Sequence, residues 1–176
     1  MGKGYLVLGE LVDFITGKTI KETHDEQYRQ QLARLLVNDK GYQKKDIKTG
    51  CELHVKAGDK SAILIIDFMV TLSGKICMII KYAPGSLVTR RRPALAISRL
   101  VAGYQVPVVV VSNGVDAEII DGSTGKVISH GLDSIPSKPE VISIAEHADF
   151  TLISEKQAVM EARIVYAFEI DGSCSI

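Results

Sequence analysis

Hydrophobic residues recur with two different spacings along the chain, and these spacings predict alternating helices and strands. Over residues 24–37 the apolar side chains lie three or four positions apart, the spacing of one helix face: Tyr28, Leu32, Leu35 and Leu36. Thr23 is expected to cap this helix, and Glu26 three positions later is expected to complete a capping box. Pro93 in a first turn predicts a second helix that runs to about Ala102.

Runs of apolar residues predict strands, most of them buried. They lie at about residues 51–55, 62–72, 76–81, 108–112, 117–120 and 126–129. The remaining elements are an extended segment at 5–15 and helices at 139–148 and 155–168. This order predicts an α/β fold, a mixed β-sheet flanked by α-helices. We expect a single domain over residues 1–176, with a core at about 13–136 and a helical C-terminal extension at 139–176.

One aspartate and one lysine interrupt the two most hydrophobic strands. Asp67 lies in the first and Lys81 in the second, and Ser73-Gly74 between them predicts a hairpin that brings both charges to the same end. An unpaired ion in a buried strand is costly, so a partner or a function is expected for each. A carboxylate and a lysine on adjacent strands make up half of a metal-dependent phosphodiesterase centre.

The composition indicates a folded globular protein. Of the 176 residues, 46% are hydrophobic and 24% are charged, which excludes a wholly disordered chain. No apolar stretch reaches the roughly 18 residues of a membrane-spanning helix, and the N-terminus lacks the pattern of an export signal. Cys51, Cys77 and Cys174 are odd in number and widely spaced, which argues against a disulfide framework or a zinc site. We therefore expect a cytoplasmic protein without a membrane partner.

The net charge of zero conceals an uneven distribution of charge. Residues 1–139 hold 19 Lys and Arg against 14 Asp and Glu, whereas residues 140–176 hold 2 against 7. Such a division permits a surface that faces phosphate groups although the whole protein is not basic.

Several segments of the chain resemble a known family. THDEQYRQQLARLLVNDKGYQKKDI and YQVPVVVVSNGVDAEIIDGSTGKV are similar to the N-terminal domain of type I restriction enzyme R subunits, here in a short stand-alone form, and the resemblance extends over about residues 13–136. It implies a nuclease fold of the PD-(D/E)XK class, named after a strand aspartate followed by an acidic residue and a lysine on the next strand. The same resemblance implies DNA as a partner.

The resemblance also assigns roles to individual residues. It implies that Asp67 holds a divalent cation, Mg²⁺ or its substitute Mn²⁺, and that Lys81 orients the attacking water or stabilises developing charge. Glu26 matches the acidic residue that many members contribute from the first helix. One position departs from the pattern, because Ile79 stands where the second acidic residue belongs and its side chain offers no ligand oxygen.

Two explanations of Ile79 remain open. The acidic role could lie elsewhere, with Glu52 on the preceding strand as a metal ligand and Glu26 reaching inward. Alternatively, the site has lost its metal, and Asp67 and Lys81 persist as a buried ion pair inside a fold kept for binding.

The loop after Lys81 carries hydroxyl and basic side chains that are candidates for binding nucleic acid. They are Ser86, Arg90, Arg91 and Arg92. At this end of the strand they could grip DNA phosphates without reading bases. In the alternative interpretation, the arginines pair with acidic residues of the C-terminal part, including Glu161 and Glu169.

The sequence therefore predicts a DNA-binding protein with Mg²⁺-dependent endonuclease activity in a restriction setting. The alternative is a catalytically inactive nuclease-fold module for DNA binding or for assembly with a partner subunit. The chain is too short to hold the ATP-driven motor of a full R subunit, so any motor is expected to come from a partner in a restriction-modification complex.

Overall fold

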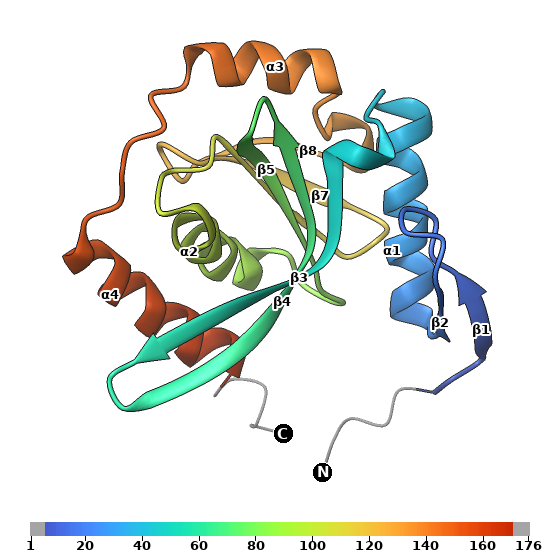
Figure 1. The fold of residues 1–176 in the computed structure, drawn as a ribbon, viewed down its shortest axis with the longest axis horizontal. Coiled ribbons are helices and arrows are strands. Elements are labelled where there is room, and N and C mark those ends of the chain that lie inside the picture. Colours follow the sequence, from blue (N-terminus) through green and yellow to red (C-terminus); the bar gives the residue numbers. More distant parts are fainter. Residues whose placement is uncertain (1–5, 171–176) are drawn as a thin grey trace.

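A mixed sheet of six strands forms the centre of the protein (Figure 1). The computed structural model describes residues 6–170. In spatial order the strands are β3 (Ile47–Ala57), β4 (Lys60–Leu72), β5 (Lys75–Tyr82), β6 (Val108–Ser112), β7 (Ala117–Asp121) and β8 (Val127–His130). The two remaining strands, β1 (Gly9–Val12) and β2 (Thr19–Glu22), form a separate antiparallel hairpin.

The sheet consists of two antiparallel meanders joined by one parallel pair. Strands β3, β4 and β5 are antiparallel neighbours, as are β6, β7 and β8, whereas β5 and β6 run parallel. A parallel pair needs a crossover connection, and a helix between β5 and β6 provides it. The β4–β5 register pairs Phe68 with Ile80, which places Asp67 and Lys81 at the same end as the sequence predicted.

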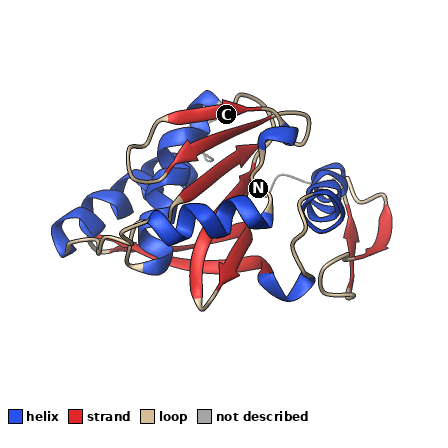
Figure 2. Cartoon of the chain, turned by 90° about the horizontal axis from the view of Figure 1, so that it is seen from above, coloured by secondary structure: helices blue, strands red, loops and turns tan. Residues whose placement is uncertain are grey.

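Helices cover both faces of the sheet. They are α1 (His24–Arg34), α2 (Arg91–Ala102), α3 (Lys138–His147) and α4 (Glu155–Val165). One hydrophobic cluster contains residues of α1 and α3, and a second contains residues of α2 and α4. Figure 2 shows the β1–β2 hairpin lying beyond α1, away from the main sheet. The predicted α/β fold, with a mixed sheet flanked by helices, is confirmed.

Several local features differ from the prediction. Strand β3 is longer than expected because its pairing with β4 continues along a projecting hairpin, and β2 was not predicted. Thr23 does cap α1 by accepting from the Glu26 N–H. The capping box is incomplete, however, because the Glu26 carboxylate turns toward Arg29 and Gln30 instead.

Two further predictions concern the ends of the chain and the membrane. Cys174 and the first residue of the extended segment 5–15 lie outside the described residues. Over residues 6–170, no helix has both the length and the apolar character needed to cross a membrane.

A buried acidic residue joins the two helices on one face. Glu161 of α4 has a side chain only 3% exposed, and its carboxylate lies 2.6 Å from Arg92 and 2.5 Å from Arg99, both of α2. Burial alone would raise the pKa of Glu161, but the two arginines outweigh this and hold the pKa below its ordinary value. Ala162 and Val165 on the same helix fill the second hydrophobic cluster, so α4 is an integral part of the fold.

We expect Glu161→Gln to lower the free energy of unfolding by about 3 kcal/mol at neutral pH, because two arginines lose a buried counter-ion. The stabilisation from Glu161 is complete above its ordinary pKa of 4.5 and is lost as the pH falls through the lower pKa of the folded state. Urea unfolding from pH 7 to pH 3 measures both effects. Equal acid sensitivity of the variant and the wild type would contradict this role of Glu161.

Candidate functional site

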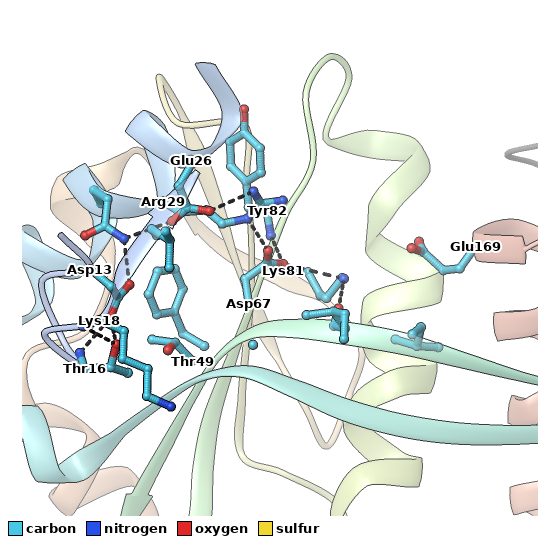
Figure 3. A pocket seen from close by; sticks show the side chains of 16 residues that line it. Asp13, Thr16, Lys18, Glu26, Arg29, Thr49, Asp67, Lys81, Tyr82 and Glu169 are labelled. Atoms are coloured by element: carbon cyan, nitrogen blue, oxygen red, sulfur yellow. Dashed lines mark hydrogen bonds and ion pairs between the residues drawn. The ribbon is translucent and has the colours of Figure 1, made fainter. Parts of the chain in front are cut away.

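A cleft lies between α1, the middle of β4 and the C-terminal end of β5 (Figure 3). Its volume is about 650 Å³, and its lining includes Asp67, Lys81 and Glu26. The turn between β1 and β2 closes one side through Asp13 and Lys18. The structure therefore brings together the three residues for which the sequence predicted a catalytic role.

Asp67 lies at the centre of this cleft, and both of its carboxylate oxygens are engaged. Arg29 of α1 donates from Nε to Oδ1 at 2.7 Å, and the backbone N–H of Tyr82 donates to Oδ2 at 2.8 Å. The Lys81 ammonium lies 3.5 Å from Oδ2 and also donates to the backbone carbonyl of Ile65. Because the Asp67 side chain is 5% exposed, these protein groups rather than water balance its charge.

Tyr82 connects α1 to the sheet beside this pair. Its ring stacks on Tyr28 with centroids 6.1 Å apart, and the Arg29 guanidinium lies 5.0 Å from the Tyr82 ring centroid. The Tyr82 hydroxyl donates to Asp25 at 3.0 Å. Burial, with the hydrogen bond to Asp25, raises the pKa of Tyr82 well above its ordinary value. The Tyr82 ring thus lies against Arg29 while its hydroxyl bonds Asp25 of the same helix.

A second group of polar side chains forms the wall beside α1. Glu26 accepts from Gln30 at 2.9 Å and lies 3.5 Å from Arg29. Gln30 also donates to Asp13 at 2.7 Å, and the N–H and hydroxyl of Thr16 donate to the other Asp13 oxygen. Burial alone would raise the pKa of Asp13, but the bonds from Thr16 and Gln30 hold it below its ordinary value. Hydrogen bonds thus connect the cleft from Asp13 to Asp67, and the ion pair with Lys81 continues the network.

The cleft in this arrangement does not fit a divalent cation. Mg²⁺ and Mn²⁺ require several oxygen ligands directed at one open point, whereas the Arg29 guanidinium already lies against Asp67 and the Glu26 carboxylate is bonded to Gln30. Within residues 6–170, no group of three or more His, Cys, Asp and Glu side chains is placed to hold a metal ion.

The two positions considered for the second acidic ligand lie away from the cleft. Ile79 is fully buried in the second hydrophobic cluster, beneath α2, and does not line the cleft. Glu52 on β3 has a side chain 61% exposed, lies 3.8 Å from His54 and is also absent from the lining. The structure therefore does not bring either position to Asp67.

The arginines after Lys81 are all engaged by carboxylates. Arg91 donates through two nitrogens to Glu118 on β7, and this bonding holds the pKa of Glu118 below its ordinary value. Arg92 contacts Glu161, and Arg90 lies 3.9 Å from Glu169. Ser86 accepts through its backbone carbonyl from Thr89. The ion pairs with Glu161 and Glu169 follow the alternative interpretation given above for this run.

Four residues of the site were not predicted from the sequence: Asp13, Arg29, Gln30 and Tyr82. Arg29 and Gln30 lie one helical turn after Asp25 and Glu26, so their spacing could have indicated that they share a helix face with these acids. The positions of Asp13 and Tyr82 depend on the docking of the β1–β2 hairpin and of α1. No local pattern in the sequence carries that information.

We expect Ile79→Glu, which restores the acidic position of the nuclease pattern, to destabilise the protein by several kcal/mol, because it places a carboxylate in an apolar core. Ile79→Val is the matched control, with an expected cost of about 1 kcal/mol. Chemical denaturation measures both variants. If Ile79→Glu were as stable as Ile79→Val, the side chain at this position would be able to turn toward the cleft.

Comparison with known proteins supplies one assignment. Residues 24–136 match the family model described as the type I restriction enzyme R protein N terminus. Neither the curated proteins nor the solved structures contain a match to the chain. The matched residues extend from the first residue of α1 to the loop before α3, so they contain Asp67, Lys81 and Glu26. The chain therefore belongs to the family of the type I restriction enzyme R protein N terminus.

Proposed function

We propose that this protein is a DNA-binding module of a restriction system, with a nuclease-type cleft that works without a metal ion. The family supports DNA and restriction-modification components as partners in general. The observation that carries the metal-free part of the proposal is the Arg29–Asp67 contact at 2.7 Å, which places a fixed cation on the carboxylate of the cleft. On this proposal, any cleavage activity comes from outside this cleft.

Three cationic side chains and four carboxylates line the cleft: Lys18, Arg29 and Lys81, with Asp13, Glu26, Asp67 and Glu169. Each of the four carboxylates is already bonded or ion-paired to protein groups. Lys18 lies exposed at the edge of the cleft, and the side chain of Lys18 has no ion-pair partner among the described residues. The Arg29 side chain is 32% exposed while it bonds Asp67, so part of this side chain faces the cleft. Exposed cations of this kind bind DNA by releasing counter-ions and need no base contacts.

A second candidate function is Mg²⁺-dependent DNA cleavage, with Mn²⁺ as a substitute. It is favoured by the presence of Asp67, Lys81 and Glu26 in one cleft. This function would require Arg29 to move away from Asp67 when DNA binds, and a further acidic residue, such as Glu52, to approach. Because it needs these rearrangements, we rank it below metal-free binding.

We expect the protein to bind duplex DNA in low salt, with an affinity that falls steeply as salt is added. Lys18→Gln should weaken binding and reduce the slope of log K against log salt by about one. The matched control is Lys126→Gln, which removes an exposed lysine from the turn before β8, at the far edge of the sheet. Fluorescence anisotropy of a labelled duplex measures these quantities. Binding that is absent or insensitive to salt would reject the proposal.

Cleavage of supercoiled and linear DNA distinguishes the two candidate functions. We expect no cleavage by the purified protein in Mg²⁺ or Mn²⁺, and no difference on adding EDTA. Asp67→Ala and Lys81→Ala serve as controls for a contaminating nuclease. Metal-dependent cleavage that both substitutions abolish would instead establish the second candidate, and Glu52→Gln would then test the missing ligand.

A further inference from the structure

The C-terminal part of the structure brings an acidic side chain to the edge of the cleft. Helix α4 continues into a π-helical turn (Tyr166–Ile170), and Glu169 on this turn lines the cleft together with Lys81 (Figure 3). Glu169 also lines a small adjoining cavity with Lys81, Arg90 and Ser112. The Glu169 side chain is 17% exposed, so its carboxylate lies against the protein beside Arg90 rather than in bulk solvent.

Of Arg90, Arg91 and Arg92, Arg90 has the longest contact to a carboxylate. Its Nη1 lies 3.9 Å from Glu169, whereas Arg92 lies 2.6 Å from its own glutamate. The Arg90 Nε is buried and has no hydrogen-bond partner among the described residues. A buried donor without a partner is costly, and a further acceptor, such as a water or an anion, would satisfy it.

From this arrangement we propose that the Glu169 carboxylate occupies a DNA phosphate position between Arg90 and Lys81, and that DNA must displace it to bind fully. The C-terminal turn would then be an autoinhibitory element. This inference rests on the proposed DNA binding. A DNA phosphate in this position could receive Nε and Nη of Arg90 together, as the Glu118 carboxylate does for Arg91. It would therefore satisfy the Arg90 donor that Glu169 leaves unpaired.

Glu169, rather than Glu161, has the placement that such an exchange requires. Glu161 is almost fully buried and lies next to Ala162 of the second hydrophobic cluster, so its release would disrupt the core. The turn that carries Glu169 contributes no buried residue. Tyr166 at its start lies against Lys60 of β4, so the displacement we consider is that of the Glu169 side chain, which leaves the core and α4 in place.

The test compares DNA affinities by fluorescence anisotropy in low salt. Glu169→Gln is expected to bind duplex DNA about two- to fivefold more tightly than the wild type, the range of a single partly exposed charge interaction. Glu155→Gln is the matched control, since it removes the same charge from an exposed position at the other end of α4. Adding Arg90→Gln to Glu169→Gln should abolish the gain.

The outcomes distinguish the autoinhibitory contact of Glu169 from the DNA binding on which it rests. A gain in Glu169→Gln, absent from Glu155→Gln and lost with Arg90→Gln, supports the autoinhibitory contact. If Glu169→Gln and Glu155→Gln bind DNA with equal affinity while the wild type shows salt-sensitive binding, the autoinhibitory role of Glu169 is rejected. The proposed DNA binding is then retained. If neither the wild type nor Glu169→Gln binds DNA in low salt, both proposals are rejected.

Discussion

An aspartate buried in a sheet has to be neutralised where it lies, and the arrangement of the cleft follows from this requirement. Asp67 receives Arg29 from one direction, Lys81 from another and a backbone N–H from the end of β5. Arg29 is fixed in turn by Tyr82 and by Glu26. Helix α1 is thereby held against the end of the sheet by charge as well as by the hydrophobic cluster beneath it.

The same kind of contact, a buried carboxylate paired with an arginine from another element, recurs elsewhere in the protein. Arg91 at the start of α2 bonds Glu118 on β7, and Glu161 on α4 lies between two arginines of α2. In each case a nearly buried carboxylate meets a partly exposed arginine that comes from a different element. The arginines thus supply both the counter-charge and the orientation of a helix. The run Arg90 to Arg92 is therefore first a structural feature, because all three arginines pair with carboxylates of the protein itself.

The strands and helices could be predicted from the sequence more fully than the contacts between them. The uninterrupted valines of β6 and the capping Thr23 of α1 specify local structure directly, and the hairpin at Ser73-Gly74 places Asp67 beside Lys81. By contrast, Arg29 reaches Asp67 across 38 positions of the chain. Only the packing of α1 on the sheet determines that contact, which in turn decides whether the carboxylate is open to a metal ion.

Because Ile79 lies beneath α2, an acidic residue at this position would not reach Asp67, and a metal site in this cleft would need a carboxylate from another position. A metal-binding cleft would need both an acidic residue near Asp67 and the removal of Arg29. Removing Arg29 alone would leave the buried Asp67 carboxylate with Lys81 as its remaining cationic partner, and an added carboxylate alone would repel Asp67. The two substitutions are therefore strongly epistatic, and no path of single, individually tolerated mutations leads easily from this arrangement to a metal-dependent one.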